Sequence, residues 1–113
     1  MKDVDTVVER FVDASIKYGE AQEEGASRIV NKQSKIIRQI VVEVKRDYES
    51  TDGKFDELLK HPNNYVRLHT AFCLLSHNPK EAETVLVDIS RMRGLLGFEA
   101  EMTLQEWKKG NLK

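Results

Sequence analysis

The stretch HPNNYVRLHTAFCLLSHNP, residues 61–79, predicts the central element of the fold. Its two prolines stand near its ends, and the residue before a proline disfavours helical geometry. Between them, apolar and small side chains occur nearly all round a helical wheel from about residue 64 to residue 76, which is typical of a helix buried on more than one side. We therefore expect a central helix there, with Asn63 or Asn64 as its N-cap.

Two longer segments before this stretch show helical periodicity. Apolar side chains recur at spacings of three and four from Val7 to Tyr18, and again from Ile29 to Tyr48 along about five turns or more. Gly25, between them, is expected to end the first helix or the short loop after it. The two segments predict an antiparallel hairpin of helices.

The remaining predicted helices are shorter. A break at residues 49–53 precedes a third helix, which Thr51 or Asp52 can cap. A fifth helix starts at the Asn-Pro-Lys-Glu sequence, where Asn78 is the expected N-cap and Glu81 is expected to reach back to its amide. The third helix begins soon after the hairpin and the fifth soon after the central helix, so no long linker separates the predicted helices.

The last predicted helix follows a glycine-bracketed link. Gly94 and Gly97 flank two leucines, and the helix after them carries Phe98, Leu104 and Trp107. Trp107 is expected to close the core at the C-terminal end. Six predicted elements therefore succeed one another without a strand.

Length and composition favour one all-α domain of five or six helices over residues 1–113, with a hairpin at 1–50 and further helices at 53–110. The 113 residues suit a single hydrophobic core, and 6 glycines and 2 prolines leave few turns for a many-stranded protein. The one cysteine cannot form an intramolecular disulfide, and the first residues lack the apolar run of a signal peptide or membrane span. We therefore expect a cytoplasmic protein without membrane partners.

The segment FDELLKHPNNYVRLHTAFCLLSHNPKEAETVLVDIS, residues 55–90, resembles one HEAT-type repeat and the end of its predecessor. The matching positions are a leucine pair, two proline turns, a Val-Arg pair, small residues and helically spaced leucines. They are Leu58-Leu59, Pro62-Asn63, Val66-Arg67, Thr70-Ala71, Leu74, Pro79, Ala82 and Leu86. The resemblance implies a right-handed HEAT-like α-α stack that presents exposed side chains to partner proteins. His61 departs from the pattern, in which an aspartate commonly precedes the proline and pairs with the arginine.

Residues 55–110 also resemble an uncharacterised family of small bacterial domains with HEAT-like helices. In stacked helical repeats the outermost helices need polar outer faces, and the acidic first predicted helix fits such a cap. A short stack can also leave an apolar end face that pairs with a second copy of the chain, so a homodimer is a further expectation.

His69, Cys73 and His77 are spaced i, i+4 and i+8, which places them in one drifting column of the central helix. Imidazole and thiolate are zinc ligands, and a cysteine beside a histidine can be a nucleophile. However, tetrahedral zinc needs a fourth ligand, and no oxyanion hole or orienting group is visible in the sequence. We therefore interpret Cys73 as a packed core residue with two histidines at its edge, and expect no catalytic residue, metal or cofactor.

Charge is divided unevenly along the chain. Residues 1–25 carry a net charge of −4 and residues 26–46 a net charge of +5, against −1 for the whole sequence. A helical wheel gathers part of the positive charge on one side, called here the basic stripe. It consists of Arg28, Lys32, Lys35 and Arg46, with Arg38 and Lys45 at its border. The stripe is either a solvated face offset by the acidic first helix or a surface for phosphates or an acidic protein.

We predict a non-enzymatic protein–protein interaction module, of which an immunity or antitoxin-like protein that blocks a partner protein is one concrete form. The alternative is a nucleic-acid-binding helical protein that uses the basic stripe. Tyr, Trp and Arg are enriched at interface hot spots. The candidate partner-binding residues are Arg28, Lys32, Lys35, Arg38, Tyr65, Arg67 and Trp107.

Overall fold

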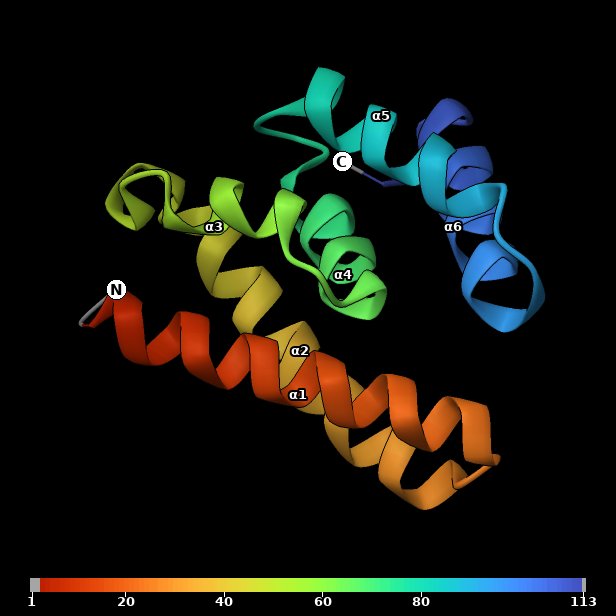
Figure 1. Cartoon of the computed structure of the whole chain (residues 1–113). Helices are drawn as coiled ribbons and strands as arrows, with labels where there is room; N and C mark the ends of the chain where they lie inside the picture. Colours follow the sequence, from red (N-terminus) through yellow and green to blue (C-terminus); the bar gives the residue numbers. More distant parts are fainter. Residues whose placement is uncertain (1–2, 113) are drawn as a thin grey trace.

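This computed structural model describes residues 3–112, which contain six α-helices (Figure 1). Two short 3-10 helices flank the shortest α-helix, and no strand occurs among these residues. The α-helices are α1 (Val4–Glu24), α2 (Ser27–Arg46), α3 (Lys54–Glu57), α4 (Asn64–Leu74), α5 (Pro79–Ser90) and α6 (Gly94–Lys108). The predicted all-α class is confirmed, since 82% of residues 3–112 are helical and these residues form one compact domain.

The first two helices form the expected hairpin. Asp3 caps α1 by accepting a hydrogen bond from the amide of Thr6. At the other end, Gly25 adopts φ 75°, and its amide donates to the carbonyl groups of Ala21 and Gln22. A residue with a side chain is disfavoured in this left-handed region, so glycine at this position stops α1 and lets α2 return along it. The prediction that Gly25 ends the first helix is confirmed.

Helix α4 lies between the α1–α2 pair and the α5–α6 pair (Figure 1). It contacts all four of these helices. The side chain of Asn63 accepts hydrogen bonds from the amides of Tyr65 and Val66, which confirms the predicted N-cap. The helix ends at Leu74, two residues earlier than expected, because residues 75–78 form the turn that leads into α5.

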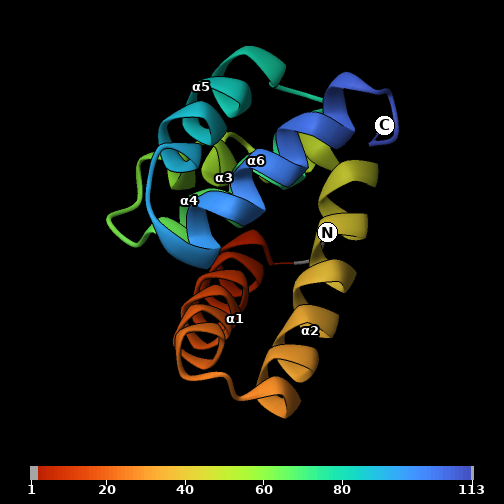
Figure 2. The ribbon, with the colours of Figure 1, turned by 90° about the vertical axis from the view of Figure 1, so that its right-hand side faces the viewer.

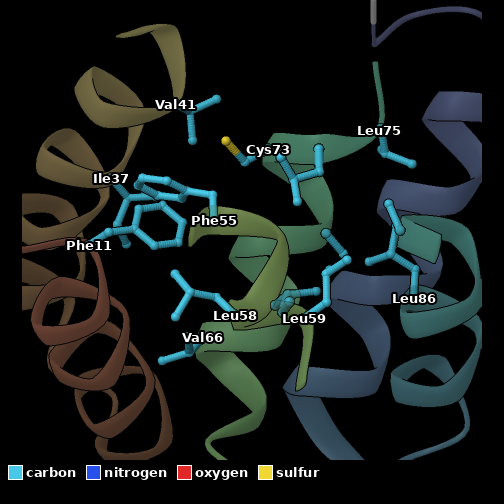
Figure 3. Close-up of a cluster of buried hydrophobic side chains, with 14 of the residues drawn as sticks. Phe11, Ile37, Val41, Phe55, Leu58, Leu59, Val66, Cys73, Leu75 and Leu86 are labelled. Carbon is cyan, nitrogen blue, oxygen red and sulfur yellow. The ribbon is translucent and has the colours of Figure 1, made fainter. Parts of the chain in front are cut away.

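The hydrophobic core gathers around α4 from every element (Figure 3). Phe11 of α1 and Phe55 of α3 are fully buried and meet edge to face, with ring centroids 5.3 Å apart. Cys73 of α4 points toward this pair and Val41, and Leu86 reaches the other side of α4 from α5. Each such side chain stabilises the fold by about 1.5–3 kcal/mol through burial.

The predicted cap of α3 is wrong, and at α5 the predicted N-cap residue is confirmed but its capping contact does not form. Helix α3 is preceded by Gly53 at φ 75°, and the hydroxyl of Thr51 instead donates to the carbonyl of Tyr48, so neither Thr51 nor Asp52 caps the helix. At α5, the amide of the Asn78 side chain donates to Asp56 and to Glu81. Asn78 is the N-cap residue of α5, as expected, but its side chain makes no capping hydrogen bond, and Glu81 contacts that side chain and not the backbone amide.

Helix α6 begins earlier than predicted. Gly94, at φ 79°, is its first residue, so the expected link between the two glycines is the first turn of the helix. Gly97 lies inside the helix and is buried. A Cβ atom at position 97 would stand 1.9 Å from the carbonyl oxygen of Met92, so this glycine permits the tight turn from α5 into α6.

Candidate functional site

The outer side of α6 is apolar. Leu95, Phe98 and Met102 are 47%, 59% and 39% exposed, and their spacing of three and four residues places them on one side of the helix. These three side chains are called here the α6 ridge. The inner side of α6 is apolar as well, with Ala100 and Leu104 buried. Phe98 therefore lies on the outer side of the helix, opposite the buried Leu104.

A cleft of about 210 Å³ lies beside α6, between α6 and α2. Figure 2 looks onto the face of the molecule that carries α1, α2 and α6, with α4 behind α6. This α2–α6 cleft is lined by Tyr18, Ser34, Ile37, Arg38, Leu68, His69, Phe72, Glu99 and Thr103. It combines polar groups from four helices with an apolar floor.

His69 enters the cleft from α4 as a neutral imidazole. Its Nδ1 lies 2.9 Å from Oγ of the buried Ser15, and its ring meets the edge of the Tyr18 ring at 4.7 Å. Burial lowers the pKa of His69 to about 4, so the ring is uncharged at neutral pH. Nε2 has no hydrogen-bond partner within residues 3–112 and is left for a group that enters the cleft.

The two walls of the cleft differ in charge. On the α6 wall, Glu99 accepts hydrogen bonds from the hydroxyl of Tyr18 at 2.6 Å and from the amide of Gln22 at 3.3 Å. Burial and the bond to Glu99 raise the pKa of Tyr18. On the α2 wall, Arg38 forms no ion pair with any described residue. The carboxylate is thus satisfied internally, whereas the guanidinium is available to a partner.

The basic stripe lies on the exposed side of α2, next to the cleft. Arg28, Lys32 and Lys35 are exposed, and none of them pairs with an acidic side chain in the described part of the chain. Arg46 lies 3.7 Å from Asp47. If the acidic first helix offsets this charge, which is one of the two alternatives, it does not do so through direct ion pairs with these residues within residues 3–112.

Three other predicted partner-binding residues lie in intramolecular contacts. Tyr65 is 8% exposed, and its hydroxyl donates to Glu23 of α1 at 2.8 Å. Arg67 donates to the carbonyl of Leu59, to Asn64 and to Asp88, and so joins α4 to its neighbours on both sides. These contacts give Arg67 a structural role between helices.

Trp107 lies half-buried against the core, and its Nε1 donates to Glu83 of α5 at 2.7 Å. The seven predicted residues therefore do not form one surface. Four of them lie on α2, and the other three form hydrogen bonds that join α4 or α6 to other parts of the fold. Arg38 is the one among the seven that lines the α2–α6 cleft. A role of the seven residues in partner binding stays a prediction.

The three residues spaced along the central helix have separate surroundings. Cys73 is fully buried, and burial raises the pKa of its thiol to about 12. His77 stacks on the ring of Tyr48, with centroids 4.5 Å apart. No group of three or more His, Cys, Asp or Glu side chains within residues 3–112 is placed to hold a metal ion. His69 is therefore the one that faces the candidate site.

Sequence reasoning missed the α6 ridge and the Glu99 wall of the cleft. A signal for the ridge was present, because α6 carries apolar residues on two opposite sides while a helix at the edge of a domain needs one apolar side. The pairing of Ser15 with His69 joins residues 54 positions apart, and no local pattern indicates it.

A family model described as a domain of unknown function, DUF2019, matches residues 5–107. No curated protein and no solved structure matches the chain. Among the helices of residues 3–112, none combines the length and the apolar character needed to cross a membrane. The family match covers the α1–α2 hairpin, the central helix and almost all of α6.

Proposed function

The chain belongs to the DUF2019 family, and we propose that it is a non-enzymatic protein-binding module that docks its partner on the α6 ridge and the α2–α6 cleft. The observation that carries this proposal is the exposure of Leu95, Phe98 and Met102 on one side of α6. An apolar patch that is contiguous and flanked by polar side chains marks an interaction site in soluble proteins.

The cleft supplies polar recognition beside this apolar anchor. Arg38 offers a guanidinium without an internal partner, and His69 offers Nε2. A partner side chain that enters the cleft can therefore form hydrogen bonds that fix its orientation, while apolar side chains cover the ridge. Aromatic anchors with neighbouring arginines are the usual centres of binding energy.

The proposal includes a HEAT-like stack as the scaffold. Consecutive helices pair as α1 with α2 and α5 with α6, and both pairs pack on α4. Such scaffolds present the outer sides of their helices to other proteins. In the immunity or antitoxin-like form of the proposal, the ridge of this small cytoplasmic domain covers the active site of a toxin.

The test is capture of a partner by the immobilised wild-type chain and two variants. Phe98→Glu places a charge on the ridge, and Val42→Glu is the matched control because Val42 is 63% exposed on α2. We expect wild type and Val42→Glu to retain the same specific protein and Phe98→Glu to lose about 30-fold or more in affinity. Equal retention by all three chains would remove the ridge as the docking surface.

Nucleic-acid binding through α2 is the second candidate. It is supported by the exposed Arg28, Lys32 and Lys35, none of which has an acidic partner within residues 3–112. Because such contacts release counterions, binding of a labelled duplex or single strand would weaken steeply with salt. A titration at low salt decides, since no binding, or equal binding after all three residues are changed to Glu, eliminates this candidate.

A further inference from the structure

We propose that the α6 ridge pairs with the ridge of a second copy of this chain, so that two α6 helices pack antiparallel about a two-fold axis. This inference rests on the proposed function, because it names one partner for the same surface. Leu95 and Met102 are seven residues apart, so the ridge runs for about 10 Å along α6. It therefore covers two turns of a helix whose inner side is already packed on α4 and α5.

The order of residues along the ridge suits a symmetric contact. A two-fold axis places the same surface of each copy against the other. If one residue meets a second residue of the partner helix, that second residue therefore meets the first one of the partner. Phe98 stands near the middle of the ridge, with Leu95 on one side and Met102 on the other. Antiparallel pairing centred there sets Leu95 of one copy against Met102 of the other and brings the two Phe98 rings together at the axis.

One pair of opposite charges at the two ends of α6, Arg93 and Glu106, favours the same arrangement. Arg93 immediately precedes α6, and Glu106 lies in its last turns, four residues after Met102 and so one turn beyond it on the same side. Neither forms an ion pair within the described residues, and Glu106 accepts one hydrogen bond, from the side chain of Asn111. Antiparallel pairing brings Arg93 of each copy toward Glu106 of the other, twice per dimer. Parallel pairing would instead set Arg93 beside Arg93.

The contact is small, which fixes the concentration range of the experiment. Stable interfaces bury about 1,200–2,000 Å² in total, and three side chains per copy supply only part of that area. We therefore expect a reversible dimer with a dissociation constant between about 10 µM and 1 mM. The free energy gained by burying so small a contact exceeds the cost of association only modestly. Purified chain alone is sufficient for this test.

Sedimentation equilibrium over that range tests the pairing. The mass of the wild-type chain should rise from 13.0 kDa toward twice that value. Phe98→Glu should raise the dissociation constant at least about tenfold, because the two copies would bring charges together at the axis. Val42→Glu should leave the dissociation constant unchanged. Circular dichroism of each variant confirms that helix content is retained.

Charge exchange tests the antiparallel register. Arg93→Glu alone and Glu106→Arg alone should each weaken self-association, because each creates two like-charge contacts per dimer. An equimolar mixture of the two variants should restore a dimer that contains one copy of each, because both contacts then join opposite charges. A mixture that associates no better than either variant alone would overturn the register.

A wild-type chain that stays monomeric to 1 mM, or a dimer that Phe98→Glu leaves intact, overturns the proposal. These results are distinct from failure of the proposed function. If the chain is monomeric but captures another protein through Phe98, the proposed function stands and self-pairing is wrong. If the chain forms a Phe98-dependent dimer but captures no other protein, self-pairing stands and binding of a different protein is wrong.

Discussion

Helices α1 and α6 both pack on α4, but their outer sides differ. No large apolar side chain of α1 is exposed within residues 4–24, and its surface carries charges such as the Asp13 to Lys17 pair at 3.0 Å. The outer side of α6 carries Leu95, Phe98 and Met102. Packing on α4 requires only one apolar side from each helix. The second apolar side of α6 therefore points to a further contact that α6 makes and α1 does not.

Two phenylalanines give the largest contrast between these helices. Phe11 of α1 is fully buried, whereas Phe98 of α6 is 59% exposed. Phe11→Ala should lower the free energy of unfolding by about 3–5 kcal/mol, because it removes a packed ring and leaves a cavity. At low protein concentration, Phe98→Ala should change the free energy of unfolding by less than about 0.5 kcal/mol. Urea denaturation at low concentration measures both, and a large loss at Phe98 would show that the ridge belongs to the core.

Two buried glycines extend the comparison. A Cβ at Gly97 of α6 would meet a backbone carbonyl at 1.9 Å, whereas one at Gly19 of α1 would meet the ring of Tyr65 at 2.4 Å. Backbone cannot move aside as a ring can, so Gly97→Ala should cost about 3 kcal/mol and Gly19→Ala about 1–2 kcal/mol. Thermal unfolding of both variants, with the exposed Lys17→Ala as control, checks the order. Equal losses would contradict the tight α5–α6 turn.

The imidazole of His69, which joins α1 to α4, predicts a smaller effect that depends on pH. Its pKa is about 4 in the folded chain against 6.5 for the free group. The unfolded chain therefore binds more protons between these values, so stability is complete above about pH 6.5 and falls as pH drops toward 4. After allowance for partial exposure, the loss attributable to His69 is about 1–2 kcal/mol.

His69→Gln should therefore flatten this part of the pH profile relative to the wild-type chain. Urea denaturation at pH 7 and at pH 4 provides the difference for each chain. An unchanged difference in His69→Gln would mean that the imidazole takes up its proton as readily in the folded chain as in the unfolded one.

The helices themselves could be predicted because their determinants are local. The αL conformation of Gly25 and the capping side chain of Asn63 each act within five residues along the chain. Features decided by distant residues were not predictable in this way. Asn78 occupies the expected N-cap position, but its side-chain amide donates a hydrogen bond to Asp56, 22 positions away, and makes no capping bond.

The outer side of α6 shows a different limit. Periodicity identifies the apolar sides of a helix but does not say which of two will face the core, and Phe98 lies on the one that stays outside. The inner side is set by Gly97, Ala100 and Leu104, whose small or compact side chains let α6 approach α5 closely. The candidate site therefore became visible only when helix packing had decided which apolar side remains outside.

The central claim is that the α6 ridge docks a second copy of the chain, and methyl NMR of the chain over a concentration series tests it most directly. Leu95 and Met102 report on the ridge, while Ile29 and Val42, 48% and 63% exposed on α2, are matched references. We predict that the Leu95 and Met102 methyl resonances shift with rising concentration while those of Ile29 and Val42 stay constant. Constant resonances at the ridge, or shifts confined to α2, would contradict the account.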